Sequence, residues 1–581
     1  MRLRFDFPAI GRDATTAGRP ASLEFTAPRH VHSARALTDV VPVVQAAEAD
    51  ANAGAWVAGF LSYEAAPAFD AALVTHPPTD LPLAWFAVFD GPAPPQTLAE
   101  ALVPTPPWQS RLSEADYRHG FAAVRDAIRA GDTYQANYTL QLESHWSGDD
   151  AWPRYAALLA AHRPPYAACL DLDDVVVLSI SPELLLEKRG RRVITAPMKG
   201  TARRGRWHDE DLAQARDLAA SAKDRAENVM IVDLARNDLG RVCAIGSVAV
   251  PSLFEVQRYR AAWQMVSTVT GTLRDDVTLT DTLAALFPAG SITGAPKTST
   301  MRLIRRIEPE PRGIYCGAIG LMAPGGDATF NVAIRTAVIA RTSGRVSLGV
   351  GGGITWDSAP AAEFAEAQLK ASFLDVPPPF ALLETMRFDG SSVVRWPRHL
   401  ARLLASAAYF DVVVDSARIT AAVNAHTALW PGVTRRVRLT VSQHGDPEVT
   451  STALAPPDGL VRVALSNTPV DSGDVFLCHK TTHRHVYDRR RAARPDVFDV
   501  LLRNERDELT EFTIGTLVLE LGGALVTPPR TAGLLAGVFR EALLEAGQIH
   551  EQTLTASDLA RASQRWLINS VREWLPVTVV P

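Results

Sequence analysis

The stretch Ala196-Pro197-Met198-Lys199-Gly200-Thr201-Ala202-Arg203-Arg204-Gly205 sets a lysine between a proline and a glycine, at the corner of a predicted loop. Two apolar runs precede it, residues 175–180 and 184–186, and they predict buried strands on either side of Ser181-Pro182-Glu183. Glycine lets a backbone approach a ligand closely. A lysine in a partly desolvated pocket can lose its proton and act as a nucleophile or base. Taken alone, the stretch fits a surface turn with a solvated lysine equally well.

Length and composition bound the rest of the chain. A chain of 581 residues is too long for one ordinary hydrophobic core, so we expect at least two domains. The composition, 47% hydrophobic and 21% charged residues, is typical of a globular protein. The net charge of -5 argues against a basic surface that binds nucleic acid. No apolar run reaches the roughly 18 residues of a membrane span, and the N-terminus has no signal-peptide core. Four scattered cysteines fit a reducing cytoplasm: Cys169, Cys243, Cys316 and Cys478.

The lysine stretch carries a family resemblance. Its Pro-Met-Lys-Gly-Thr-x-x-Arg-Gly pattern resembles the Pro-Ile-Lys-Gly-Thr signature of the chorismate-utilising enzymes, in the branch of the aminodeoxychorismate synthase large subunits (component I). Anthranilate synthases, the nearest branch, usually carry alanine at the position of Lys199. Further motifs follow in the family's order between about residues 110 and 372. The resemblance implies an α/β fold for residues 1–375, a sandwich of two packed sheets with helices outside. Its variable N-terminal part is residues 1–105, and its catalytic core is residues 110–372.

Three glutamates are implied as magnesium ligands. The segment 223–241 has apolar residues at helical spacing among many acids and amides, which alone is typical of a solvated helix face. In the family, the glutamate matching Glu227 ligates magnesium. Glu363, Glu366 and Lys370 are spaced i, i+3, i+7 and share one helical face, where a plain salt-bridge stripe is the alternative. The resemblance makes Glu366 a ligand and Glu363 a direct or water-mediated one. Carboxylates without histidine or cysteine suit Mg²⁺.

Other motifs are implied to hold chorismate. A Gly/Pro-punctuated loop, residues 287–297, leads into a predicted helix whose free N–H groups suit anions. Arg335, on a predicted strand at 330–336, needs an anionic partner, which is a buried ion pair or a substrate carboxylate. Gln264 stands where many relatives have histidine, and we assign it no catalytic role. The residues expected to bind the substrate are Thr293, Gly294, Tyr315 (on a predicted strand at 313–320), Arg335, Gly351, Gly352 and Lys370.

The implied chemistry is amination of chorismate at C4. Mg²⁺ would neutralise the ring carboxylate and polarise the ring. Lys199 would attack C2 and expel the C4 hydroxyl, ammonia would add at C4, and Glu183 would serve as general acid or base. Alanine in place of the lysine would let ammonia add at C2, the anthranilate route. Since no cysteine has the glycine-flanked setting of a glutaminase, we expect a separate glutamine amidotransferase to supply ammonia.

A second domain follows the linker Val376-Pro377-Pro378-Pro379. Its stretches Leu477-Cys478-His479-Lys480-Thr481-Thr482, Leu509-Thr510-Glu511-Phe512-Thr513 and Gly533-Leu534-Leu535-Ala536-Gly537-Val538-Phe539-Arg540 follow one another along the chain. In this order they resemble the fold-type IV pyridoxal-phosphate enzymes, which include aminodeoxychorismate lyase, over nearly all of residues 380–581. Carried over, Lys480 forms the Schiff base and Glu511 pairs with the pyridinium nitrogen. The remaining cofactor contacts implied are Arg402, the backbone N–H groups around Val538 and Phe539, and Asn569. Two departures stand out: Thr516 replaces the usual asparagine, and the first strands of the fold are trimmed.

The fusion of the two domains predicts two consecutive steps toward 4-aminobenzoate and folate. The product of the first domain, aminodeoxychorismate, would lose pyruvate in the second. Two rivals stay open: an anthranilate synthase large subunit with an aminotransferase-like appendage, and a synthase with a non-catalytic C-terminal scaffold. Lys199 argues against the first, and the presence of both Lys480 and Glu511 argues against the second. A homodimer through the C-terminal domain is a further expectation.

Overall fold

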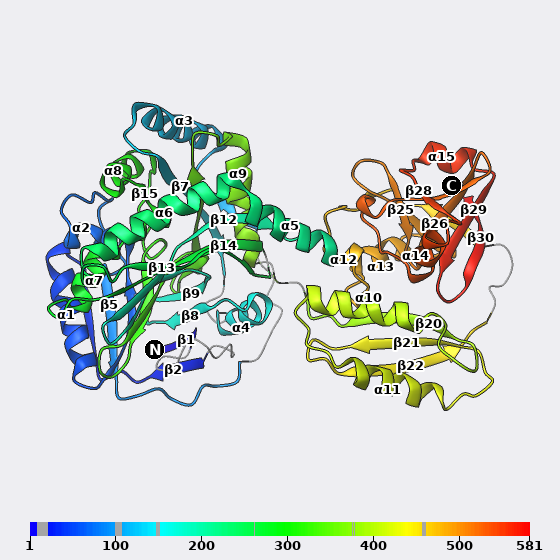
Figure 1. The fold of residues 1–581 in the computed structure, drawn as a ribbon, viewed down its shortest axis with the longest axis horizontal. Helices are drawn as coiled ribbons and strands as arrows, with labels where there is room; N and C mark the ends of the chain where they lie inside the picture. Colours follow the sequence, from blue (N-terminus) through cyan, green and yellow to red (C-terminus); the bar gives the residue numbers. More distant parts are fainter. Residues whose placement is uncertain are drawn as a thin grey trace. The chain divides into compact units, whose positions relative to one another are not determined.

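A computed structural model describes residues 1–8, 21–98, 107–146, 151–260, 262–374, 376, 378–455 and 461–580. The chain divides into two compact units (Figure 1). The first comprises Met1–Arg204 and Gln214–Val376, and the second comprises Gly205–Ala213 and Pro377–Pro581. Parts of the predicted variable N-terminal region, and Pro377 of the predicted linker, lie outside the described residues.

The first unit is built on two sheets (Figure 1). One has the strand order β15-β7-β19-β18-β9-β8-β1-β2, with β6 beside β7. The other has the order β12-β14-β11-β10-β17-β16-β4-β5-β3, with β13 beside β14. The strands of the first sheet are β1 Arg2–Phe7, β2 Ala21–Thr26, β6 Gln109–Ser110, β7 Gln135–His145, β8 Tyr166–Asp171, β9 Val175–Ser181, β15 Gly294–Ala295, β18 Thr336–Ala340 and β19 Arg345–Ile354. Those of the second are β3 His30–Ala34, β4 Trp56–Leu61, β5 Ala84–Phe89, β10 Leu184–Arg189, β11 Arg192–Ala196, β12 Met198–Arg203, β13 Ala249–Arg258, β14 Ala262–Thr272, β16 Ala318–Met322 and β17 Ala328–Val332.

Apolar residues of both sheets meet in one buried cluster. Phe5 and Val177 come from the first sheet, and Phe60 and Ile319 from the second, and all four are at most 1% exposed. Each sheet also has one buried apolar cluster on the side that its helices cover. The helices are α1 Leu37–Asn52, α2 Ala66–Phe69, α3 Glu114–Ala130, α4 Ala151–His162, α6 Ala222–Gly240, α7 Leu279–Leu286, α8 Lys297–Ile307 and α9 Pro360–Leu369. Helix α5, His208–Ala220, belongs to the second unit as far as Ala213 and to the first unit from Gln214. The predicted two-sheet sandwich with outer helices is therefore confirmed.

Local signals fixed several of these elements. Helix α3 begins after Ser113, whose hydroxyl accepts from the Asp116 N–H, and ends at Gly131 with φ of +80°. A polar N-cap and a left-handed C-terminal glycine are the expected boundaries of a helix. The predicted strand at 175–180 is β9, and the predicted helix at 223–241 is α6.

Three expected placements were wrong. Lys199 lies within strand β12, at a register irregularity between Met198 and Thr201, because Gly200 takes φ of +97° and bends the strand. The strand predicted at 313–320 begins only at Ala318, so Tyr315 lies in a turn. Arg335 is on no strand, since it takes φ of +50° in the connection between β17 and β18. Apolar neighbours do not reveal such left-handed residues.

The second unit also has two sheets. A small sheet, β20-β21-β22, packs on α10 and α11, and a larger mixed sheet has the order β25-β24-β23-β30-β29-β26-β27-β28. Its strands are β20 Leu382–Phe388, β21 Arg435–Val441, β22 Pro447–Ala453, β23 Val461–Leu465, β24 Asp499–Arg503, β25 Leu509–Phe512, β26 Gly515–Leu521, β27 Ala524–Thr527, β28 His550–Glu551, β29 Gln564–Asn569 and β30 Glu573–Val580. Its helices are α10 Trp396–Tyr409, α11 Ser416–Thr427, α12 Val475–Cys478, α13 His485–Ala492, α14 Val538–Glu545 and α15 Ala556–Arg561.

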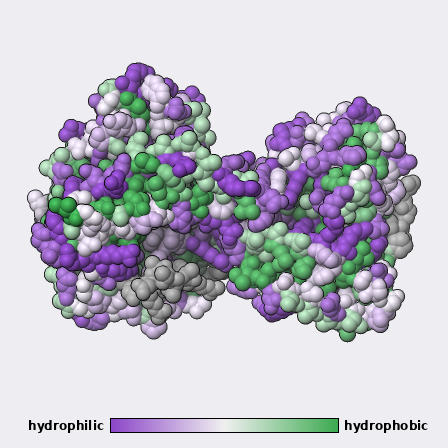
Figure 2. Space-filling view, viewed as in Figure 1, coloured by the Kyte–Doolittle hydropathy of each residue, from purple (hydrophilic) through white to green (hydrophobic). Residues whose placement is uncertain are grey.

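On the face that Figure 2 shows, hydrophobic residues occur in patches among hydrophilic ones. Within the described ranges, no helix has the length and apolar character needed to cross a membrane.

Candidate active sites

Lys199 lies on strand β12, where its backbone is held by a hydrogen bond, and its amine lies beside a glycine of strand β19. The amide of Asn228, on α6, donates to the Lys199 carbonyl at 3.0 Å, and the Ser267 hydroxyl donates to the Asn228 carbonyl oxygen at 2.5 Å. The Lys199 Nζ atom lies against Gly353 of β19, where an added Cβ would come within 2.7 Å of it. Glycine at this position therefore leaves room for the amine, and any larger residue would displace it.

The amine lies in a field of mixed charge. Burial lowers the pKa of Lys199, Lys370 lowers it further, and Glu227, Glu183 and Glu363 act in the opposite direction. The structure thus brings four sequence-predicted residues within electrostatic reach of the lysine. An amine with a depressed pKa is neutral more often at pH 7, as a nucleophile requires.

Glu227, on α6, and Glu363, on α9, lie within electrostatic reach of each other. Burial raises the pKa of Glu227, and the Glu363 charge raises it further. Glu366 instead pairs with Lys370 at 2.9 Å, and Lys370 also donates to the Gly351 carbonyl at 2.7 Å. Gly352 leaves space for this group, since an added Cβ would be 3.1 Å from the Glu363 Oε2 atom. Two carboxylates that repel each other fit a hard cation, because a cation would relieve the repulsion.

Glu183 is set up to exchange a proton. It follows β9, is 3% exposed, and accepts from the Ser291 hydroxyl at 2.5 Å. Burial raises the pKa of Glu183 to about 7, although the Ser291 hydrogen bond and the Lys199 charge oppose the shift. A carboxyl that titrates near neutrality can serve as a general acid or base.

Gln135, on β7, is not among the site residues that the sequence predicted. Its side chain is fully buried, and neither amide atom has a hydrogen-bond partner among the described residues. The Nε2 atom lies against Gly353, within 2.5 Å of an added Cβ, on the side where Lys199 Nζ also lies. A buried amide left unpaired is costly, so an orphan beside a reactive amine points to a ligand.

Replacing Gln135 by leucine should therefore stabilise the free protein and weaken chorismate binding. Removing an unpaired buried amide should gain about 1–3 kcal/mol of unfolding free energy. The affinity for chorismate should fall at least about tenfold, since one ligand hydrogen bond is lost. Thermal unfolding and calorimetric titration measure the two effects.

A matched control is Gln141→Leu on the same strand. The Gln141 amide donates to the Pro311 carbonyl at 2.5 Å, so its removal should destabilise the protein by about 1 kcal/mol and leave chorismate binding unchanged. Destabilisation by both variants would show that Gln135 is a structural residue.

The other predicted substrate residues lie around the same sheets. The Thr293 hydroxyl donates to the Ala289 carbonyl, and Gly294 sits so close to Gln135 that an added Cβ would be 2.1 Å from its carbonyl oxygen. Tyr315 is buried against Gly349. Burial lowers the pKa of Arg335, and within the described residues no carboxylate pairs with it. Gln264 accepts from the Thr201 hydroxyl at 2.8 Å, which ties β14 to β12.

In the second unit, Lys480 opens into a cavity of about 320 Å³. The Lys480 carbonyl accepts from the Leu383 N–H at 2.9 Å, which fixes the lysine beside β20. Burial, followed by the charges of Arg402 and Arg484, lowers the pKa of Lys480 to about 8. Near pH 7, about one such amine in ten is neutral, against about one in several thousand for an exposed lysine.

Glu511 lies on β25 in the same cavity. Burial raises the pKa of Glu511 to about 7. The Tyr487 hydroxyl and the Leu535 N–H both donate to its Oε1 atom, at 2.7 and 3.2 Å. The second oxygen, Oε2, is thus available to a protonated ring nitrogen, which would hold the carboxylate in its charged form.

Arg402 reaches the cavity with its guanidinium already ordered. It pairs with both oxygens of Glu384, at 2.9 and 2.6 Å, and donates to the Ala536 carbonyl at 3.1 Å. Burial by itself would raise the pKa of Glu384. The charges and hydrogen bonds of Arg402 and His399 outweigh burial and lower the pKa of Glu384 to about 2. Two of the five Arg402 N–H donors remain for an anion.

The start of α14 forms one wall of the cavity. Gly537 is the N-cap of the helix, and a Cβ added to it would be 3.0 Å from the Thr516 hydroxyl. Thr516, which stands where the resembling enzymes usually have asparagine, therefore lies beside the helix N-terminus. Val538 lines the cavity, while the Phe539 ring packs on Trp574 and leaves its N–H as the usable group. Asn569 accepts from two N–H groups of the following turn. The amine, the carboxylate and the anion-binding helix start fit pyridoxal phosphate.

Two arginines that the sequence did not indicate as site residues, Arg436 and Arg438, also line this cavity. Arg436 and Arg438 project from β21 on the same face, because strand residues i and i+2 share a side. Both are exposed. The spacing of two arginines on a cavity-facing strand was the signal that could have found them.

The rate at which the cofactor-free protein captures pyridoxal phosphate should rise with pH through about 8 and then level off. Only the neutral Lys480 amine reacts, and its pKa is about 8. Arg484→Gln should move this midpoint to higher pH, because Arg484 is one of the charges that lower the pKa. Stopped-flow absorbance of the adduct measures both midpoints.

The exposed Arg489, on α13, supplies the control for this titration. Arg489→Gln should leave the midpoint unchanged, since Arg489 is not among the influences on Lys480. A rise that continues to pH 10 in the unsubstituted protein would contradict the assignment.

Comparison with known proteins agrees with this geometry. Residues 5–375 match the family described as chorismate binding enzyme, and residues 381–580 match amino-transferase class IV. The chain belongs to the chorismate binding enzymes, with a class IV aminotransferase domain at its C-terminal end. It is 42% identical over 262 residues to aminodeoxychorismate synthase component 1 of Salmonella typhimurium, covering 45% of this chain and 57% of that relative.

An anthranilate synthase is almost as similar in sequence. Anthranilate synthase component 1 1 of Haloarcula marismortui is 41% identical over 259 residues, covering 45% of this chain and 52% of that relative. The chain thus spans little more than half the length of these curated relatives. The solved isochorismate synthase DhbC of Bacillus anthracis, at 21% identity, shares the fold with a TM-score of 0.53 over 64% of this chain and 94% of that one. Overall identity does not separate the two synthases, so individual residues must.

Proposed function

We propose that the chain makes 4-aminobenzoate in two steps. The first unit aminates chorismate at C4, with ammonia from a separate glutamine amidotransferase. The second unit eliminates pyruvate from the resulting 4-amino-4-deoxychorismate. The observation that carries the proposal is the half-buried Lys199, whose amine lies against Gly353 within electrostatic reach of Glu183, Glu227 and Glu363.

In the first unit, Lys199 acts as nucleophile and Glu183 as proton carrier. The neutral amine attacks C2, both ring double bonds shift toward C4, and the C4 hydroxyl departs as water with a proton from Glu183. Ammonia then attacks C4, both double bonds shift back, and the C2–nitrogen bond to Lys199 breaks. Bound Mg²⁺, held by Glu227 and Glu363, with Glu366 once it leaves Lys370, would neutralise the ring carboxylate. Arg335 and Lys370 would hold the substrate carboxylates.

In the second unit, Lys480 moves the proton. It removes the proton from C4 of the substrate and returns it to the departing pyruvate, and the ring becomes aromatic. Pyridoxal phosphate would supply an electron sink, with Glu511 at its ring nitrogen and the α14 N-terminus, Arg402 and the Asn569 turn around its phosphate. Arg436 and Arg438 give the cavity mouth the positive charge that a dicarboxylate needs.

Two rivals are tested by one product assay. The purified chain receives chorismate, ammonium and Mg²⁺, with and without pyridoxal phosphate. We expect 4-aminobenzoate and pyruvate in equal amounts only when the cofactor is present. Anthranilate would make the chain an anthranilate synthase, and aminodeoxychorismate as the end product would make the second unit a scaffold.

The remaining parts of the proposal concern the chain's surroundings. The four cysteines are buried and free, which supports the reducing cytoplasm. Glutamine should replace ammonium only when an amidotransferase partner is added, and sedimentation should give twice the chain mass if the second unit forms a homodimer.

A further inference from the structure

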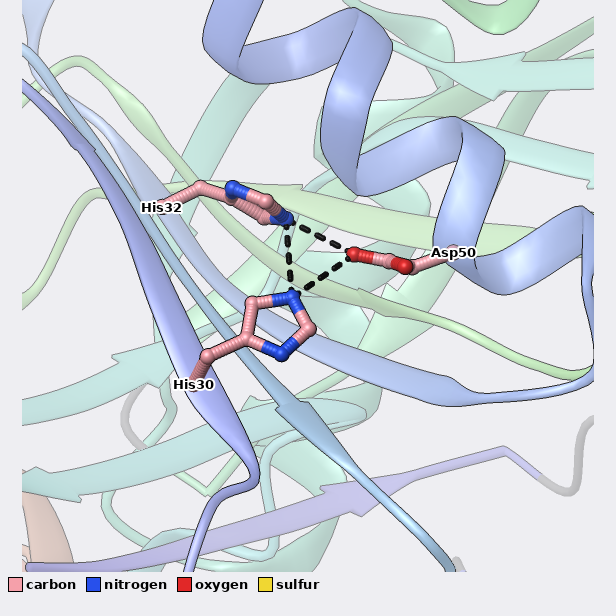
Figure 3. A group of neighbouring side chains, drawn as sticks. All are labelled: His30, His32 and Asp50. Carbon is pink, nitrogen blue, oxygen red and sulfur yellow. Dashed lines mark hydrogen bonds and ion pairs between the residues drawn. The ribbon is translucent and has the colours of Figure 1, made fainter.

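Three side chains converge at the surface of the first unit, outside the residues of the proposed reaction. His30 and His32 lie on β3, an edge strand of the second sheet, and share one face because they are two residues apart. Helix α1 packs against this strand and presents Asp50 near its C-terminal end (Figure 3). Residue order does not reveal this cluster, since 18 residues separate Asp50 from His32.

The three ligand-type atoms approach one another pairwise. The two Nε2 atoms are 3.2 Å apart, and they are 3.0 and 2.7 Å from the Asp50 Oδ2 atom. Hydrogen bonds account for only two of these three contacts. If both imidazoles donate to Asp50, the two N–H groups face each other, and if one lacks its proton, its contact with the carboxylate pairs two acceptors. A cation at the centre would satisfy all three atoms.

The spacing matches that of a metal site. With metal–ligand distances of about 2.0–2.2 Å, octahedral to tetrahedral angles place neighbouring ligand atoms about 2.8–3.6 Å apart. The separations of 3.2 and 3.0 Å lie within this range, and the 2.7 Å contact lies just below it. Among the described residues, His30, His32 and Asp50 form the one group of three or more histidines, cysteines or acids whose ligand atoms all lie within 4.8 Å of one another.

The donor set selects the kind of metal. Two imidazole nitrogens and one carboxylate oxygen suit zinc and other divalent transition metals, whereas Mg²⁺ prefers oxygen alone. The side chains are 48%, 24% and 32% exposed for His30, His32 and Asp50, so water can complete the coordination. We propose that His30, His32 and Asp50 form a zinc-class metal site that fastens the edge strand β3 to the end of α1.

Zinc titration of the full chain tests the site. The protein is stripped with a chelator and kept in excess Mg²⁺, which occupies the glutamate site. We expect one Zn²⁺ per chain by calorimetry and metal analysis, a higher unfolding temperature with Zn²⁺, and visible d–d absorption with Co²⁺. His32→Ala and Asp50→Asn should each weaken binding at least about 10- to 100-fold, since even loss of an outer-shell partner costs that much.

His119→Ala is the matched control, because His119 is an exposed histidine of α3 outside the cluster. It should bind Zn²⁺ like the unsubstituted protein. Equal zinc affinity in His32→Ala and the unsubstituted chain, or absence of stoichiometric zinc binding, would overturn the proposal. Because all three variants keep the reaction residues, their product rates in Mg²⁺ alone should be unchanged, which separates this test from that of the proposed function.

Discussion

Lys199→Ala should lower the rate of C4 amination at least about 10³-fold, because the variant lacks the nucleophile that opens the C4 position. This factor corresponds to about 4 kcal/mol of activation free energy. Chromatography of the reaction with chorismate, ammonium and Mg²⁺ measures the products. Since alanine frees the space beside Gly353, any remaining amination should occur at C2 and give anthranilate-type product.

Two comparisons make this result specific. Lys199→Arg keeps the positive charge near Glu227 and Glu363 but removes the amine, and it should be as inactive as the alanine variant. Lys188→Ala removes a lysine of β10 that donates to the Gly326 carbonyl, outside the site, and it should retain the full rate. C4 amination that survives in Lys199→Ala would refute the assigned role and leave the two synthase branches undistinguished.

Lys480→Ala should stop the reaction at 4-amino-4-deoxychorismate. The first unit keeps all its residues, so consumption of chorismate continues while pyruvate release falls at least about 10³-fold. The purified variant should also lack the visible absorbance of a covalently held cofactor. Pyruvate is measured by a coupled assay, and the cofactor by its spectrum.

Glu511→Gln provides the companion measurement. It keeps the size of the side chain and the Tyr487 contact but removes the charge that would face the ring nitrogen. Cofactor should still bind through Lys480, while pyruvate release should fall by about 10² or more. If Lys480→Ala released pyruvate at the unsubstituted rate, the elimination would belong to another site or to spontaneous decay.

Local sequence predicted the elements whose signals are local. Ser113 and Gly131 bound helix α3 as a polar N-cap and a C-terminal glycine do, and the apolar run at 175–180 is strand β9. The sequence missed the paths of Lys199, Tyr315 and Arg335, because a positive φ at Gly200, Cys316 or Arg335 is set by packing rather than by residue type.

The sequence by itself determined which reactive groups the chain possesses: a lysine in place of alanine at 199, glutamates without histidine for a hard cation, and Lys480 with Glu511 in the second unit. Only the tertiary structure decided their state. Burial shifts the pKa values of Glu183, Lys199 and Lys480, and the orphaned Gln135 and the convergence of His30, His32 and Asp50 arise where distant segments meet. Desolvation and long-range contact depend on how the sheets and helices pack, which residue order alone does not specify.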